Sequence, residues 1–120
     1  MTLINFFKGF IFKHRTNDDN SKMVFDHYFF DLKYYLQKNA SIEDFSSLLN
    51  ISTDNIKKIS YSFYNSSFQM LINENRYRHF INELESPVNA NLSIDSIIKL
   101  CGYENSDKFV DYTNTKSKHE

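Results

Sequence analysis

Apolar residues recur at helical spacing along most of this 120-residue chain, and polar caps or breakers separate the runs. Steps of three and four residues place side chains on one face of an α-helix, whereas a strand requires strict alternation. Only two Gly and one Pro occur, so few tight turns are encoded. Hydrophobic residues make up 41% of the chain, enough for a buried core. The pattern predicts an all-α fold of about six or seven helices.

The first 40 residues are predicted to form a helical N-terminal extension. Residues 1–15 are a short apolar segment rich in Phe and Ile, and residues 16–22 are all polar, which indicates a linker. Residues 24–38 then show the spacing of one amphipathic helix. We interpret its apolar stripe as a packing surface rather than a ligand site. The stripe consists of Phe25, Tyr28, Phe29, Leu32, Tyr35 and Leu36.

Two short helices are predicted next. Ser41, followed three residues later by Asp44, is a capping box, in which each side chain bonds a free amide at the helix start. This helix has an apolar face of Ile42, Phe45, Leu48 and Leu49. Residues 50–52 break the pattern, and Ser52 caps a second helix with the stripe Ile56, Ile59 and Phe63. Two short helices with so short a break are typical of a helix-turn-helix.

A longer helix is predicted over residues 67–84, and it ends before Pro87 because proline forces its predecessor out of helical geometry. Ser93 then caps a further helix, whose apolar face carries Ile94, Ile97, Ile98 and Cys101. Gly102 ends that helix, where a left-handed residue is favoured. A last short helix is predicted to begin at Asn105 or Ser106 and to contain Phe109 and Tyr112.

The two predicted helix pairs resemble each other. Ser41-Ile42-Glu43 matches Ser93-Ile94-Asp95 at an offset of 52 residues, and the apolar positions that follow also match. This favours a duplicated helix-turn-helix joined by the long helix. About 17 residues at about 1.5 Å each give a rod of roughly 25 Å. Such a rod can place two recognition helices about one turn of DNA apart.

The chain from Ser41 to about Tyr112 resembles the AraC-type DNA-binding domain in the order and spacing of its motifs. The resemblance implies a tandem helix-turn-helix domain over residues 41–116, followed by a tail at residues 117–120. The motifs that carry it are Ser41-Ile42-Glu43-Asp44-Phe45, Asn50-Ile51-Ser52, Phe68-Gln69-Met70-Leu71-Ile72-Asn73-Glu74-Asn75-Arg76, Leu92-Ser93-Ile94 and Gly102-Tyr103.

The resemblance implies a transcriptional regulator whose partner is double-stranded DNA. In this family the second helix of each unit reads the major groove, which gives two sets of candidate DNA-binding residues. Arg76 matches the family's linker-helix arginine, for which we expect a structural role. The candidate sets are Thr53, Asp54, Asn55, Lys57, Lys58 and Tyr61 in the first unit, and Asn105, Ser106, Asp107 and Lys108 in the second.

The C-terminal part departs from the family pattern. After Phe109, family members usually show a basic residue, a second aromatic and further lysines, where this chain has Asp111, Thr113 and Asn114. We therefore expect the second unit to lack an anchor for its core and positive charge for phosphates. Ten acidic residues between Ser41 and Lys116 outnumber seven basic ones, which are Lys57, Lys58, Arg76, Arg78, Lys99, Lys108 and Lys116.

Phosphate neutralisation dominates nonspecific affinity, so this charge balance predicts weak DNA binding. It leaves open an alternative function. In that alternative, a degenerate helix-turn-helix serves as a protein-interaction module without DNA binding, with homodimerisation through the Phe-rich segment 1–15. A third reading makes the chain a membrane-proximal fragment of a larger regulator, with segment 1–15 as the remnant.

Other classes of function lack their sequence signals. His14, His27, His79 and His119 show no metal-ligand spacing, and no glycine-rich phosphate loop is present. We therefore expect no metal, no cofactor and no enzymatic activity. Cys101, the single cysteine, is interpreted as a small buried hydrophobe. One cysteine and no apolar run near 18–20 residues indicate a cytoplasmic protein without membrane association.

Overall fold

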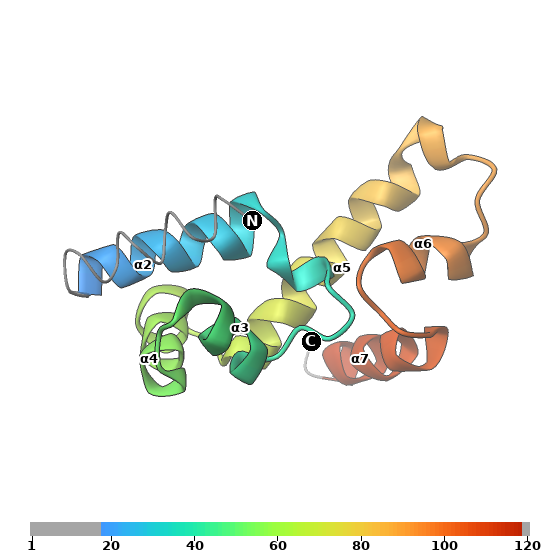
Figure 1. The fold of residues 1–120 in the computed structure, drawn as a ribbon. Coiled ribbons are helices and arrows are strands. Elements are labelled where there is room, and N and C mark those ends of the chain that lie inside the picture. Colours follow the sequence, from blue (N-terminus) through green and yellow to red (C-terminus); the bar gives the residue numbers. More distant parts are fainter. Residues whose placement is uncertain (1–17, 119–120) are drawn as a thin grey trace. The chain divides into compact units, whose positions relative to one another are not determined.

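The structure, a computed structural model, describes residues 18–118 and contains only helices in that range (Figure 1). The prediction of an all-α fold is confirmed. Predictions for segment 1–15 lie outside the described residues. The α-helices are α2 (Asp18–Asp26), α3 (Ile42–Leu49), α4 (Thr53–Tyr64), α5 (Phe68–Glu85), α6 (Ile94–Leu100) and α7 (Ser106–Lys118). A π-helix (His27–Asp31) and two 3₁₀ turns (Tyr34–Leu36 and Pro87–Asn89) complete the described elements.

The chain forms two compact units. Of the described residues, unit 1 comprises 18–34 and 39–71, and unit 2 comprises 35–38 and 72–118. Helix α5 begins in unit 1 and continues in unit 2. The predicted N-terminal extension is thus divided between the units, because Tyr35–Lys38 belongs to unit 2 while the residues on either side belong to unit 1.

The N-terminal helix differs from the predicted linker and single amphipathic helix. Asp18–Lys22, placed in the linker, form the first turns of α2. The α-helix ends at Asp26 and continues as a π-helix. Lys33 then adopts a left-handed conformation with φ 55°. The sequence does not predict this turn, because the residue there is not glycine. The chain is redirected there, so that Leu32 is exposed while Tyr34 and Tyr35 are buried.

An aromatic cluster forms the core of unit 1. Phe25 and Phe29 of the N-terminal helix pack against Phe45 of α3 and Phe68 of α5, with ring centroids 5.2–6.1 Å apart. Each buried Phe contributes roughly 1.5–3 kcal/mol through burial, and such ring pairs add about 0.5–1.5 kcal/mol. The interpretation of this stripe as a packing surface is confirmed for the buried members Phe25, Tyr28, Phe29 and Tyr35.

The start of α3 shows half of the predicted capping box. The Ser41 hydroxyl accepts a hydrogen bond from the Asp44 amide at 3.0 Å, as predicted. The reciprocal bond runs through Tyr34 instead. The Ser41 amide donates to the Tyr34 hydroxyl at 3.0 Å, and that hydroxyl lies 2.8 Å from the Asp44 carboxylate, to which it donates. The tyrosine therefore anchors the N-terminus of α3 to the aromatic cluster, which it also contacts through Phe45.

Helix α4 is fixed at both ends by residues with helix-terminating geometry. The Ser52 hydroxyl accepts from the Asn55 amide at 3.1 Å, which confirms the predicted cap. Asn65 ends the helix in a left-handed conformation with φ 53°. Ile56 and Ile59 are buried, whereas Phe63, predicted on the same stripe, is exposed. Periodicity assigned Phe63 to the same side of the helix as Ile59, with which it lines one groove, but half of its surface is exposed.

Loss of the α4 cap gives a measurable stability change. We expect Ser52→Ala to lower the free energy of unfolding by about 1 kcal/mol, because it removes the acceptor for an amide at the helix start. Urea unfolding followed by circular dichroism at 222 nm measures this difference. Ser47→Ala, at an exposed position within α3, is the matched control and should not destabilise the protein. Equal stability of Ser52→Ala and wild type would contradict the capping role.

The core of unit 2 is formed by Phe80, Ile97, Ile98, Cys101 and Tyr103. Helix α7 is anchored to α5 by aromatic contacts. The Phe109 ring lies 4.6 Å from that of Phe80, and the Tyr112 ring lies 6.1 Å from that of Tyr77. The expectation that this unit lacks an anchor for its core is therefore wrong, since Phe109 and Tyr112 supply it.

The turns of unit 2 follow the predicted breakers. Helix α5 ends at Glu85, before Pro87, and Ser93 caps α6 by accepting from the Ser96 amide at 3.1 Å. Gly102 is left-handed with φ +94°, as predicted. Leu84 and Ile94, predicted on apolar faces, are exposed. Both lie next to the connector between α5 and α6, where the helix faces extend beyond the buried core.

Arg76 has the structural role expected of it. Its side chain is only 8% exposed and binds the chain segment Tyr35–Lys38. Nε donates to the Tyr35 carbonyl at 2.6 Å, and an Nη donates to the Gln37 carbonyl at 2.7 Å. The guanidinium also lies over the Tyr103 ring, 5.4 Å from its centroid. Backbone carbonyls and an aromatic face thus compensate the buried charge.

Cys101 is fully buried, which confirms its interpretation as a small hydrophobe. Burial raises the pKa of its thiol to about 11, with a smaller contribution from the Glu83 carboxylate. At pH 8 only about a thousandth of the thiol is then ionised, so alkylation by iodoacetamide should be at least 100-fold slower in the folded protein than in urea. Mass spectrometry over time measures both rates. Comparable rates in the two states would contradict the burial.

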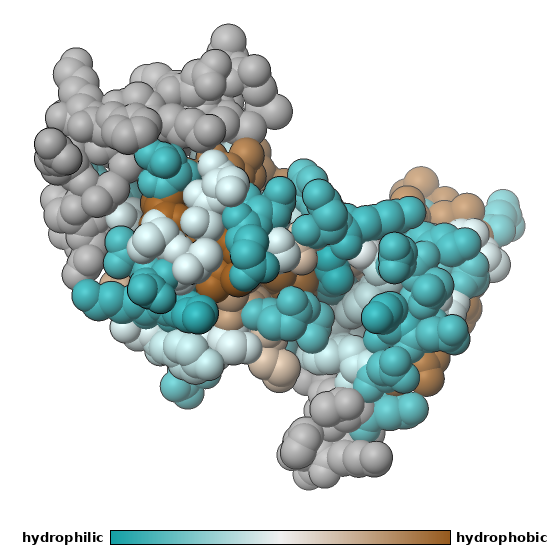
Figure 2. Space-filling view, turned by 60° about the horizontal axis from the view of Figure 1, so that its bottom comes forward, coloured by the Kyte–Doolittle hydropathy of each residue, from teal (hydrophilic) through white to brown (hydrophobic). Residues whose placement is uncertain are grey.

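Within the described residues, no helix combines the length and the apolar character needed to cross a membrane. On the face shown in Figure 2, hydrophilic residues dominate the described surface, and apolar residues form smaller patches between them.

Candidate nucleic-acid interface

Helix α4 presents most of the first candidate set on its outer side. Asp54, Asn55, Lys57, Lys58 and Tyr61 are exposed, and Thr53 is half-buried at the helix start. Tyr61 is 59% exposed, a large value for an aromatic residue. The opposite side of the helix is held in the core of unit 1 by Ile56 and Ile59. The six residues therefore share one rigid, outward-facing element.

The charges on this face are mixed but favour the cations. Asp54 and Tyr61 each lie three or four residues from both Lys57 and Lys58, so these four residues lie on one side of the helix. Asp54 occupies the first turn, where a carboxylate stabilises the positive end of the helix dipole. Two lysines and one aspartate leave a net charge of +1 on this face.

Lys57 and Tyr61 border an open hollow of about 260 Å³. The N-terminal residues of two other helices also line it, Ser41, Ile42 and Glu43 at α3 and Ser67, Phe68 and Gln69 at α5. Lys57 and the hydroxyl and amide side chains are groups that contact phosphate oxygens in protein–DNA complexes. Glu43 adds a negative charge at the rim of the hollow, which weakens its attraction for anions.

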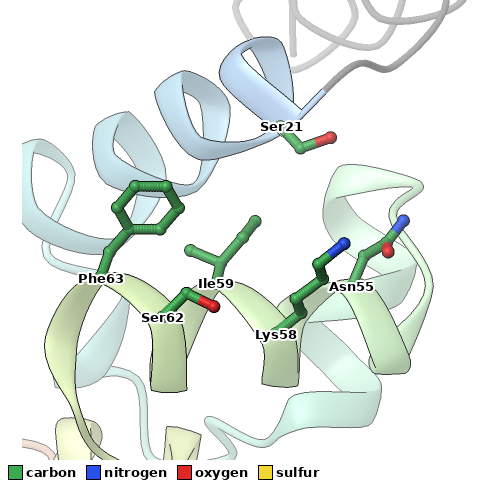
Figure 3. Close-up of a pocket in the computed structure, with 6 residues that line it drawn as sticks. All are labelled: Ser21, Asn55, Lys58, Ile59, Ser62 and Phe63. Carbon is green, nitrogen blue, oxygen red and sulfur yellow. The ribbon is translucent and has the colours of Figure 1, made fainter.

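Asn55 and Lys58 border a second groove, on the other flank of α4 (Figure 3). This groove lies between α4 and the first turns of α2, and its volume is about 140 Å³. Ser21 of α2 lines the groove from one side, and Ile59, Ser62 and Phe63 of α4 line it from the other. This neighbour was not predicted, because Ser21 falls in the segment expected to be a linker.

The second candidate set lies at the start of α7 in unit 2. Asn105 caps the helix, since its side-chain oxygen accepts from the Lys108 amide at 3.2 Å. The Ser106 hydroxyl donates to the Asp95 carboxylate of α6. This bond, followed by the Lys99 ammonium, holds the pKa of Asp95 below its usual range. Asn105 and Ser106 thus bind the protein itself, and Asp107 and Lys108 are exposed.

The start of α7 is a weaker candidate than α4. Of residues 104–108, Lys108 alone is basic, whereas Asp107 and Glu104 are exposed acids. An additional carboxylate, Asp95, lies at the same helix start and is paired with Lys99 at 3.3 Å. Because DNA phosphates repel carboxylates, this end of unit 2 offers little electrostatic attraction.

Comparison with known protein families, with curated proteins and with solved structures gives no match to this chain. Among the described residues, no group of three or more His, Cys, Asp or Glu side chains is placed to hold a metal ion. The candidate site therefore rests on the geometry and charge of α4.

Proposed function

We propose that this chain is a transcriptional regulator of the AraC type that binds double-stranded DNA through α4. In this proposal α3 and α4 form a helix-turn-helix, with the turn at residues 50–52, and α4 enters the major groove. The observation that carries the proposal is the outer face of α4. It places the whole first candidate set on one helix, whose other side is anchored in an aromatic core.

The side chains of α4 have distinct roles in this proposal. Lys57 and Lys58 contact phosphates on either side of the groove and fix the register of the helix. Asn55 reads adenine, for which its amide offers a matching donor and acceptor. Tyr61, exposed on the same face, packs against the sugar or a thymine methyl group. Thr53 and Asp54 lie at the end of the helix that reaches deepest into the groove.

The second helix-turn-helix, α6 and α7, makes the smaller contribution. We propose α5 as the helix that links the two. Asn105 and Ser106 already bond within the protein, and the acids around Lys108 oppose phosphate. Binding should therefore depend on a single half-site more than on a pair.

The proposal predicts weak, salt-dependent DNA binding. We expect fluorescence anisotropy to show binding of a random-sequence duplex at low salt, with log K falling as log salt rises. The slope should correspond to roughly two to four neutralised phosphates, about −0.9 for each. A folded sample that shows no binding at tens of micromolar protein would contradict it.

The acid surplus of residues 41–116 favours a second candidate function, a protein-interaction module without DNA binding. In that case homodimerisation through segment 1–15 or capture of another protein is the role of the chain. Sedimentation equilibrium distinguishes the two candidates. A tight dimer that ignores DNA supports the module, whereas a sample that binds DNA with the expected salt slope supports the regulator.

A further inference from the structure

The open hollow at the starts of α3 and α5 combines an aromatic ring, a carboxylate and a cation. Tyr61 and Lys57 of α4 supply the ring and the cation, and Glu43 of α3 supplies the carboxylate. A carboxylate repels a bare anion, so the hollow is poorly suited to an isolated phosphate. It is better suited to a ligand that has a flat ring, an edge of hydrogen-bond donors and a separate negative charge.

The polar groups of the hollow are available to such a ligand. The Glu43 and Lys57 side chains are exposed, and within the described part of the chain neither has an ion pair or a hydrogen-bond partner. Tyr61 is 59% exposed. The Ser41 and Ser67 hydroxyls each accept a hydrogen bond from an amide of the helix that follows, so each retains a proton to donate.

The walls of the hollow are fixed by the core of unit 1. Phe68, one of the residues that line it, is only 4% exposed, and its ring is stacked 5.0 Å from that of Phe45 in α3. Ile56 and Ile59 hold the other side of α4 in the same unit. A hollow with fixed walls costs a ligand little reorganisation on binding.

Size and donor pattern define the ligand. A cavity of about 150 Å³ holds one benzene ring. The hollow, at about 260 Å³, has room for the two fused rings of a purine. Guanine is the common base whose Watson–Crick edge presents two adjacent N–H donors, at N1 and the 2-amino group, and a carboxylate accepts both. That edge is occupied by cytosine in a duplex. We propose that the hollow binds an unpaired guanine of a single-stranded nucleic acid.

Each group of the hollow has one role in this complex. The guanine ring stacks on Tyr61, as unpaired bases do on exposed aromatic side chains. Glu43 accepts from N1–H and the 2-amino group, Lys57 pairs with a phosphate, and the Ser41 or Ser67 hydroxyl donates to the guanine O6. Because the hollow is open, the neighbouring nucleotides of a strand can leave it on either side.

This site does not depend on the proposed duplex binding, because none of its contacts requires a major groove. Lys57 and Tyr61 belong to both sites, so the strand and the duplex would exclude each other at α4. A protein that binds the guanine strand but no duplex would retain this site and refute the proposed function alone.

The first experiment titrates the full chain, without duplex, with a DNA pentanucleotide that has one guanine between thymines. We expect saturable ¹H–¹⁵N shifts at residues 41–43, 61 and 67–69. Replacing guanine by adenine should weaken binding at least tenfold, and replacing it by hypoxanthine, which lacks the 2-amino group, at least fivefold. Guanosine 5′-monophosphate should bind at least threefold more weakly than the strand, because it lacks the flanking phosphates.

Variants separate base reading from stacking. Glu43→Gln should weaken the guanine strand at least tenfold and change the adenine strand less than threefold. Tyr61→Leu should weaken both strands at least fivefold, since stacking does not distinguish the bases. Glu85→Gln is the matched control, because it makes the same charge change at an exposed position in unit 2. It should change the affinity for either strand less than twofold.

Equal affinity of the wild-type protein for the guanine and adenine strands would overturn the proposal. So would an unchanged preference for guanine in Glu43→Gln, or the absence of shifts at the hollow. Guanosine 5′-monophosphate that binds as tightly as the pentanucleotide would refute the single strand as the ligand.

Discussion

Gly102→Ala is expected to lower the free energy of unfolding by about 3 kcal/mol or more. Gly102 has φ +94°, a conformation that costs an L-residue about 1–2 kcal/mol. A Cβ atom there would also lie 2.8 Å from Arg76 Nε, 2.9 Å from the Tyr35 carbonyl oxygen and 3.0 Å from that of Leu36. Overpacking of this kind adds about 1–3 kcal/mol, because backbone atoms cannot move aside as a side-chain end can.

Urea unfolding by circular dichroism measures the effect of Gly102→Ala. Asn50→Gly is the matched control, because Asn50 is left-handed with φ 55° but exposed at the end of α3. That change should alter stability by a few tenths of a kcal/mol at most. A Gly102→Ala protein as stable as wild type would show that the chain around Arg76 is not packed as described.

Arg76→Met is expected to lower the free energy of unfolding by about 3 kcal/mol. The change keeps most of the apolar stem but removes two hydrogen bonds from a charged donor, each worth about 1.5–3 kcal/mol. The carbonyls of Tyr35 and Gln37 are then left without these donors in or near the core. Relief of the desolvation cost of the buried guanidinium offsets part of the loss.

A local measurement distinguishes the loss of the two Arg76 hydrogen bonds from a general destabilisation of the fold. Hydrogen exchange in native buffer should show faster exchange for the amides of residues 35–38 in Arg76→Met than in wild type. Arg78→Met is the matched control, since Arg78 is exposed on the same helix. It should leave both stability and exchange near wild-type values. Loss of stability in Arg78→Met equal to that in Arg76→Met would contradict the specific role of Arg76.

Local signals in the sequence predicted much of this fold. Ser41, Ser52 and Ser93 cap helices where the sequence places them, and Gly102 takes the left-handed position. These features succeed because a cap or a left-handed turn depends on a few neighbouring residues. The same is true of the α5 end before Pro87.

Features that depend on residues far apart in the sequence were not predicted. The bend at Lys33 carries no glycine, and beside it Leu32, predicted on the apolar stripe, is exposed while Tyr34, outside that stripe, is buried. The bonds of Arg76 join residues about 40 positions apart, although the resemblance had suggested a structural role. Periodicity likewise placed Phe63 on the apolar face of α4. It did not predict that the Phe63 side chain is exposed.

The candidate site, like the fold, was predicted only in part from the sequence. The first candidate set lies together on α4, five of its six members exposed, as an interface requires. The hydrogen bonds of Asn105 and Ser106 within the protein were not predicted, because their partners include Asp95 in another helix. The neighbour of Asn55 and Lys58 was also missed, since Ser21 had been assigned to a linker.

Charge reversal on the outer face of α4 is the direct test of whether this helix binds DNA. We would compare the DNA affinities of Lys57→Glu/Lys58→Glu and Lys33→Glu/Lys38→Glu by fluorescence anisotropy at low salt. Each pair of changes takes the net charge from −1 to −5, since each substitution removes two charge units, and all four lysines are exposed. We expect at least a 50-fold loss of DNA affinity for the α4 pair and less than a fivefold loss for the other pair. Equal losses would show that only net charge matters and would contradict recognition by α4.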